Sequence, residues 1–180
     1  RDVWAAGLEA VLLRAGFALV GIVALEVYTA LIRSPERVVL DLLPVDAVAV
    51  VRFEVLRVGR ERAWLVAGLA LMLGPIGWEG SWLVWALSAL ALAGIYVLAL
   101  PASAATHLLA VQVAESERWS AVLDLFRGGN PRPQAAFLYA PGVALAAAGG
   151  VVYGAANGVG RVLQGDLVGL LGLALPFALG

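Results

Sequence analysis

The sequence predicts an all-α fold, a polytopic membrane helical bundle with amphipathic cytoplasmic helices between the spans. Hydrophobic residues make up 62% of the 180 residues, and only 14% are charged. Soluble domains contain roughly 45–50% apolar and about 25% charged residues, so a soluble fold of this size would expose much apolar surface. The apolar residues also gather in stretches long enough to cross a bilayer. We therefore expect a single transmembrane domain over residues 1–180.

Five apolar stretches predict five spans. Each long stretch approaches the roughly 20 residues that a helix needs to cross a hydrocarbon core. Trp78-Glu79-Gly80 forms the short turn at the junction of the second and third spans, so these two should form a tight helical hairpin. The sequence begins at Arg1 rather than Met and stops at Gly180 inside an apolar run, so we expect a piece of a longer protein. The expected spans cover about 12–32, 63–79, 81–103, 135–157 and 167–180.

The polar connection at 33–62 is predicted to form two helices on the membrane surface. It holds six arginines and five acidic residues, which is too much charge for a span. Ser34-Pro35-Glu36 is typical of a helix start, with an N-cap, a proline in the first turn and an acid beside it. Leu43-Pro44 ends that short helix, because the residue before a proline disfavours the α conformation. In the second helix one face carries Val48, Val51, Val55 and Val58, and another carries Arg52, Arg57, Arg60 and Glu61.

A second polar connection is expected at 104–134. Trp119, Val122, Leu123 and Phe126 follow helical spacing, so this stripe would rest on lipid or the bundle, or bind a partner. The two connections together carry nine of the twelve arginines, which predicts that both are cytoplasmic. Every basic residue is Arg, as is typical of a GC-rich bacterial genome. We therefore expect a multi-pass protein of the bacterial inner (plasma) membrane.

Small residues recur every four positions along the fourth span. Such a stripe lets another helix approach closely. The neighbouring helix would belong either to the same bundle or to a second copy of the chain, and the sequence leaves both open. The helix-packing candidates are Ala146, Gly150, Gly154 and Gly158.

The sequence contains no recognisable catalytic, cofactor or metal site. Cysteine is absent and histidine occurs once, which excludes disulfides, thiolate sites and a two-histidine zinc site. No nucleophile elbow and no phosphate-binding loop is present, so an enzyme is not expected. The net charge of −1 gives no basic field for nucleic acid.

Two polar residues near the ends of spans remain candidates for function. Glu26 lies within the first span. It is either a structural residue, at the membrane boundary or as a neutral hydrogen-bonded acid, or a ligand for a substrate or ion. His107 lies where the third span leaves the membrane, as either an interfacial polar residue or a proton-coupled group.

The segment from Arg33 to Arg62 resembles the membrane subunits of type-2 ABC exporters, the ABC-2-like permeases. The resemblance rests on a charged start, a Leu-rich short helix and a Leu-Pro-Val turn, at Glu36, Arg37, Leu40, Leu42, Leu43, Pro44 and Val45. In that family the turn region is a coupling helix that sits in a groove of the ATPase. The resemblance implies that the apolar turn docks and that a polar rim surrounds it. The implied coupling residues are Glu36, Arg37, Leu42, Leu43, Pro44, Val45, Asp46 and Arg52.

We therefore expect the permease subunit of an ATP-driven ABC-type exporter, with ATP hydrolysis in a partner subunit. The expected partners are a cytoplasmic ATP-binding-cassette ATPase, a second permease copy or homologue, and membrane lipid. The alternative is a non-transporting integral membrane subunit that anchors or assembles a larger complex. An intramembrane enzyme is the weakest hypothesis, because no pair of nucleophile and base is visible.

Overall fold

The computed structural model describes residues 2–33, 46–75, 81–115 and 132–179. Within these residues the regular structure is helical throughout, with no strand, which confirms the all-α prediction. The helices are α1 (Asp2–Arg33), α3 (Ala47–Arg62), α4 (Trp64–Met72), α6 (Trp82–Glu115), α8 (Arg132–Leu163) and α9 (Gly169–Leu179).

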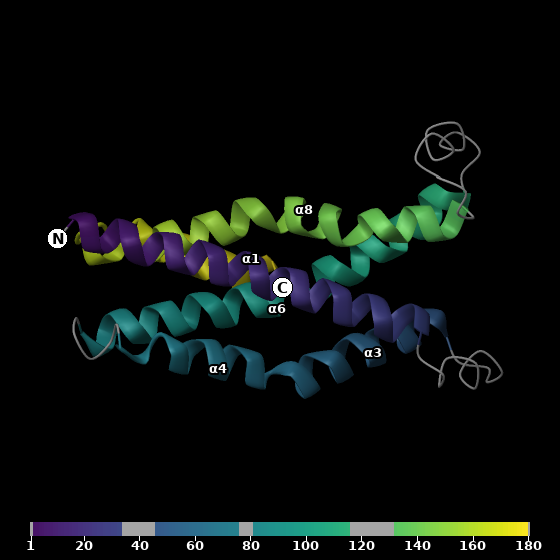
Figure 1. Ribbon diagram of the computed structural model, residues 1–180, viewed down its shortest axis with the longest axis horizontal. Coiled ribbons are helices and arrows are strands. Elements are labelled where there is room, and N and C mark those ends of the chain that lie inside the picture. The colour runs from purple at the N-terminus through teal and green to yellow at the C-terminus, as the bar shows by residue number, and fades with distance from the viewer. Residues whose placement is uncertain (1, 34–45, 76–80, 116–131, 180) are drawn as a thin grey trace.

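Among the described residues, three helices contain stretches long and apolar enough to cross a membrane. These stretches are Gly7–Leu31 in α1, Trp82–Leu109 in α6 and Gly142–Leu163 in α8. All three run roughly along the long axis of the molecule (Figure 1). The described fold therefore contains three helices that could span a membrane, as the sequence predicts.

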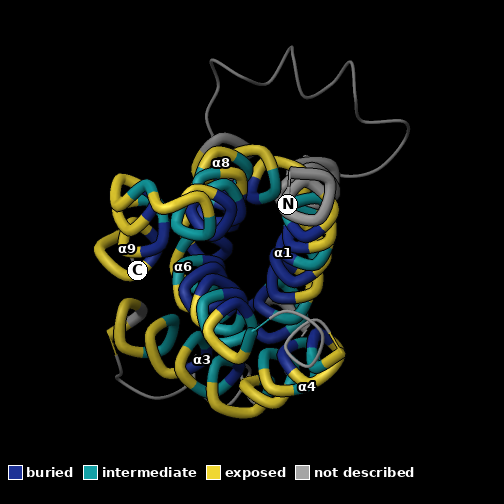
Figure 2. The backbone as a smooth tube through the Cα atoms, turned by 90° about the vertical axis from the view of Figure 1, so that its left-hand side faces the viewer, coloured by how far each residue is buried: buried dark blue, intermediate teal, exposed yellow. Residues whose placement is uncertain are grey.

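The three long helices pack against one another and form the centre of the bundle. Viewed along the bundle, their buried sides face inward and their exposed sides face outward (Figure 2). Leu19, Leu92 and Val152 are at most 1% exposed and come from α1, α6 and α8 respectively. A Cβ at Gly16 would lie 2.7 Å from Val152 Cγ1 and 3.1 Å from Ile95 Cδ1. Glycine at this position thus allows all three helices to meet.

The shorter helices cover two different sides of this centre. Helix α9 packs on α6 and α8, whereas α3 and α4 pack along α6, with α3 also contacting α1 (Figure 2). Helix α1 ends and α3 begins at the same end of the bundle where α6 ends and α8 begins (Figure 1). The start of α6 and the turn from α8 to α9 lie at the opposite end.

Helices α3 and α4 form one nearly continuous rod. Ala63 separates them, yet its φ of −55° and ψ of −28° are helical. The N–H of Val66 donates to the carbonyl oxygen of Ala63 at 3.1 Å, which tightens the joint. At this joint the charged residues of α3 give way to the apolar residues of α4. The predicted second span starts at the same position, residue 63.

Helix α6 extends beyond the expected third span. The sequence places the end of that span at 103, but the helix continues to Glu115. The polar residues that suggest an end, Thr106 and His107, are 8% and 2% exposed. They lie inside the protein, so the helix has no reason to stop at them.

The turn between α8 and α9 is a Schellman motif closed by Gly165. The N–H of Asp166 donates to Arg161 O at 2.9 Å, and that of Gly165 donates to Val162 O at 3.0 Å. This pattern places Gly165 in the left-handed region, with φ of +87°. Asp166 Oδ1 then accepts the N–H of Val168 at 3.0 Å, immediately before α9.

Candidate functional site

Helix α3 exposes large apolar side chains, two of which also border the groove described below. Its N-cap is Asp46, whose Oδ1 accepts the N–H of Val48 at 3.3 Å. The side chains of Val48, Phe53 and Leu56 are 70%, 59% and 63% exposed. An exposed face of this kind is suited to contact with lipid or another apolar surface.

The inner face of α3 holds an ion pair. Glu54 is only 3% exposed, and its Oε2 lies 2.8 Å from Arg57 NH2. Val58 is buried and Val51 and Val55 are partly buried against the core, which the sequence pattern anticipated. The pattern differs at Val48, which is exposed, and at Arg57, which turns toward Glu54 because a buried carboxylate requires a partner.

Specific contacts fasten the end of α3 to two neighbouring helices. Arg62 NH2 lies 3.0 Å from Oε1 of Glu26 on α1. The hydroxyl of Tyr96 on α6 donates to the carbonyl oxygen of Gly59 at 2.7 Å. We call these two contacts the α3 clamp. Glu26, a candidate for function from its place in the first span, is thus an ion-paired residue about one-third exposed.

The indole of Trp85 extends this attachment along α4. Its Nε1 donates to the carbonyl oxygen of Ala70 at 2.7 Å. Helix α6 therefore holds both α3 and α4 through aromatic donors, Tyr96 for α3 and Trp85 for α4.

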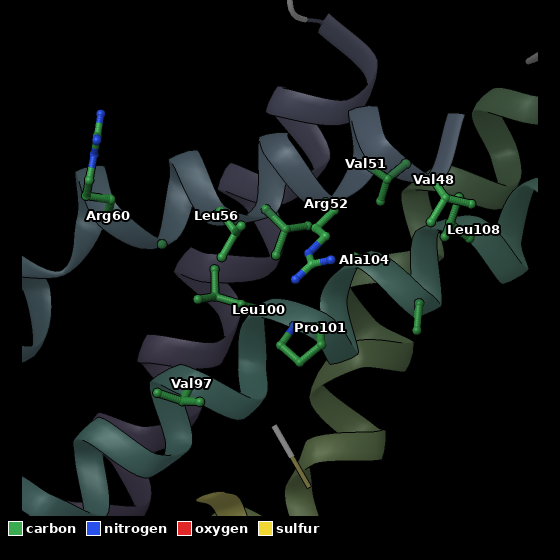
Figure 3. Close-up of a pocket in the computed structure, with 13 residues that line it drawn as sticks. Val48, Val51, Arg52, Leu56, Arg60, Val97, Leu100, Pro101, Ala104 and Leu108 are labelled. Atoms are coloured by element: carbon green, nitrogen blue, oxygen red, sulfur yellow. The ribbon is translucent and has the colours of Figure 1, made fainter. Parts of the chain in front are cut away.

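A groove of about 800 Å³ lies between α3 and the second half of α6. Its walls include Val51 and Leu56 from α3, and Leu100 and Leu108 from α6 (Figure 3). Pro101 also lines it, and a proline inside a helix removes a backbone donor and favours a bend. The groove is apolar apart from two arginines of α3.

Arg52 and Arg60 are the charged residues among the described lining of the groove. The guanidinium of Arg52 lies between the two helices, whereas the side chain of Arg60 points away from α6 (Figure 3). Both side chains are exposed. Within the described part of the chain, neither has an ion-pair partner.

His107 is buried between α1 and α6. Its Nε2 lies 3.1 Å from the carbonyl oxygen of Ala24, so Nε2 is the donor, because a carbonyl can only accept. The ring packs against Tyr28, with 5.4 Å between ring centroids. Nδ1 has no hydrogen-bond partner among the described residues. His107 thus joins two spans within the core.

The small-residue stripe of α8 divides into two parts. Gly154 and Gly158 pack against α9, where a Cβ at Gly158 would lie 2.7 Å from the carbonyl oxygen of Gly169. Ala146 and Gly150 are exposed, and a Cβ at Gly150 would meet nothing within 4 Å in the described structure. Close packing therefore occurs within the chain at one part and leaves the other part uncovered.

Most of the predicted coupling residues lie outside the described residues, namely Glu36, Arg37, Leu42, Leu43, Pro44 and Val45. Of the remaining two, Asp46 caps α3 and Arg52 faces the groove. The stripe from Trp119 to Phe126 also lies outside the described residues.

Sequence reasoning missed Tyr96, Trp85 and the groove. Both aromatic residues lie in an apolar span, where nothing in the sequence separates a hydrogen-bond donor from a packing residue. The sequence did contain a signal for the groove. Arg52 places a charge among the valines of α3, and Pro101 interrupts the apolar sequence of α6.

Comparison with known proteins yields no relative. No protein-family model, curated protein or solved structure matches the chain. The described residues also contain no group of histidine, cysteine or acidic side chains that could hold a metal ion.

Proposed function

We propose that this chain is the membrane-spanning permease subunit of an ATP-driven ABC-type exporter. Its α3 helix, with the segment that precedes it, couples a cytoplasmic ATPase to the bundle. The proposal starts from the resemblance of residues 33–62 to the coupling region of type-2 ABC permeases. The single observation that supports it most is the α3 clamp.

The α3 clamp gives a route for mechanical coupling. One end of α3 is joined to α1 by Arg62 and Glu26, and to α6 by Tyr96 and Gly59. The other end begins at Asp46, directly after the segment that resembles a docking turn. A displacement at Asp46 would therefore move two spans together, as a coupling element must.

Isolation of the intact chain from its native membrane tests for the partner. The expected result is a stoichiometric ATP-binding-cassette subunit whose ATP hydrolysis rises when the chain is present in proteoliposomes. Arg37→Glu should abolish that rise. Arg161→Glu is the matched control, because it makes the same charge reversal on an exposed arginine at the turn from α8 to α9, away from α3. If no such ATPase accompanies the chain, the permease assignment fails.

The clamp itself is tested by exchanging its charges. Glu26→Arg alone should leave the ATPase bound but no longer stimulated, since Arg62 would then face a like charge. The double variant Glu26→Arg with Arg62→Glu should recover stimulation. Loss of ATPase binding in the single variant would contradict a role in transmission, because Arg62 ends α3, at the opposite end of that helix from Asp46.

A second candidate function is a non-transporting membrane subunit that anchors or assembles a larger complex. One observation favours it: two buried hydroxyl groups of α6 donate to carbonyl oxygens of their own helix. Ser88 Oγ donates to Val84 O at 2.8 Å, and Thr106 Oγ1 donates to Ser103 O at 2.9 Å. Such groups line no polar path for a substrate. Isolation of a stable complex that lacks any ATPase would support this function.

A further inference from the structure

We propose that the groove between α3 and α6 binds an anionic phospholipid, with its phosphate on Arg52 and an acyl chain between the helices. This inference goes beyond the permease assignment and does not depend on it. It rests on the shape, lining and charge of the groove, and on its position along the spans.

The lining of the groove fits a hydrocarbon chain. Leu56, Leu100 and Leu108 form its apolar walls. Its volume of about 800 Å³ falls in the range of roughly 300–1,000 Å³ that is usual for sites of small ligands. At Gly59 the two helices come into contact, since a Cβ there would lie 2.9 Å from Leu100 Cδ1. This contact closes the groove at Gly59.

The charge of the groove fits a phosphate. The guanidinium of Arg52 lies between α3 and α6 (Figure 3). Arg52 and Arg60 line the groove, no acidic residue does so among the described residues, and neither arginine has an ion-pair partner there. A cation beside an apolar surface is well matched by an amphipathic anion, whose charged group pairs with the cation while its apolar part covers the surface. Guanidinium groups bind phosphate oxygens through two parallel hydrogen bonds.

The position of the groove fits a lipid of one leaflet. Its α6 wall runs from Val97 to Leu108, the second half of the membrane-crossing stretch Trp82–Leu109. It thus lies toward the end of the bundle where α3 begins, which arginine counting predicts to be cytoplasmic. Anionic lipids give the cytoplasmic leaflet a negative surface potential. Arg52 would sit near the headgroups while the apolar walls extend toward the bilayer centre.

Native mass spectrometry of the full chain tests the proposal. The purified protein is exposed to phosphatidylglycerol or to phosphatidylcholine with identical acyl chains. We expect phosphatidylglycerol to be retained about tenfold more strongly, a ratio in keeping with one charge-assisted contact. Equal retention of the two lipids would overturn the proposal.

Variants assign the preference to the groove. Arg52→Gln should reduce retention of phosphatidylglycerol to the level of phosphatidylcholine. Arg161→Gln is the matched control, because Arg161 is also exposed but lies at the other end of the bundle, near Asp166. Ala105→Trp, which places a large ring in the groove, should reduce retention of both lipids. An Arg52→Gln protein that keeps its lipid preference would refute the site.

Two further arms exclude other occupants. Glycerophosphoglycerol, which has the same headgroup without acyl chains, should not displace the lipid at equal concentration. Displacement would assign the site to a free phosphate compound and overturn the proposal. A second copy of the chain as occupant would give a lipid-free dimer that Ala105→Trp separates, and that result would overturn it too.

Discussion

Tyr96 illustrates, at the scale of one residue, how a polar atom is accommodated inside an apolar bundle. It is 6% exposed, and its hydroxyl donates to the backbone of α3 at Gly59 over 2.7 Å. A buried hydroxyl needs such a partner, because an unsatisfied one costs about 1–3 kcal/mol. The bond also joins two helices that the chain separates by 19 residues, from Arg62 to Trp82. This one hydrogen bond thus gives the buried hydroxyl of Tyr96 a partner and also attaches α3 to α6.

Replacing Tyr96 by phenylalanine should therefore lower stability by about 1 kcal/mol, the net worth of one buried hydrogen bond. Gly59 O would also lose its side-chain donor. Unfolding in mixed detergent micelles, followed by circular dichroism, measures the change. Tyr153→Phe is the matched control, since Tyr153 is 55% exposed on α8. Equal stability of the two variants would show that the Tyr96 bond does not hold α3.

Single residues also show the limit of the sequence. Glu26 is recognisable as an acid inside a span. Its partner Arg62 lies 36 positions later, in a segment that the sequence predicts to lie on the membrane surface. Only the packing of α3 against α1 brings the two together. Tyr96 gives no sequence signal at all, because a tyrosine in an apolar span is equally suited to packing. The sequence could therefore identify Glu26 as a residue of interest, but it could not identify the residue with which Glu26 pairs.

At the scale of elements, helix starts follow from local chemistry. Asp46 and Ser81 cap α3 and α6 by accepting the N–H two residues later, as short polar side chains do at such positions. The change of composition after Arg62 likewise marks the joint with α4. The extension of α6 to Glu115 was not predictable in this way, because polar His107 suggests an end. Its contact with Ala24 on another helix keeps it buried.

The hairpin of α8 and α9 depends on glycine at a close crossing. A Cβ at Gly158 would lie 2.7 Å from Gly169 O and 3.2 Å from Leu173 N, and both atoms belong to backbone that cannot rotate away. Gly158→Ala should therefore separate the helices and destabilise the protein by about 1–3 kcal/mol, the usual cost of overpacking. Detergent unfolding of the purified chain measures this cost.

Gly150 provides the control for that prediction on the same helix. A Cβ there meets nothing within 4 Å of the described structure, so Gly150→Ala should be neutral or stabilise by up to about 1 kcal/mol through helix propensity. If both variants behave alike, the close α8–α9 crossing is absent. A sequence could predict the stripe from its spacing, but not which half of it is covered.

At the scale of the whole molecule, the directions of the helices agree with the distribution of arginine. The end of α1, the start of α3, the end of α6 and the start of α8 gather at one end of the bundle (Figure 1). These are the four points that border the arginine-rich connections. The turn from α8 to α9 and the start of α1 lie at the other end, which has fewer arginines: Arg161 in the turn and Arg1 directly before α1. One orientation in the membrane therefore satisfies both the fold and the positive-inside rule.

Cysteine labelling can test this orientation directly, because the chain contains no native cysteine. Ala49→Cys lies at the start of α3 and Gln164→Cys in the turn before α9, and both positions are exposed. In intact bacterial cells with a permeable outer membrane, a membrane-impermeant maleimide should label Cys at 164 and spare Cys at 49. Permeabilising the inner membrane should expose both. The reverse pattern would place α3 outside the cell, where no ATPase could reach it. That result would refute the permease proposal, while the lipid groove, which depends on local charge and shape, would remain in the other leaflet.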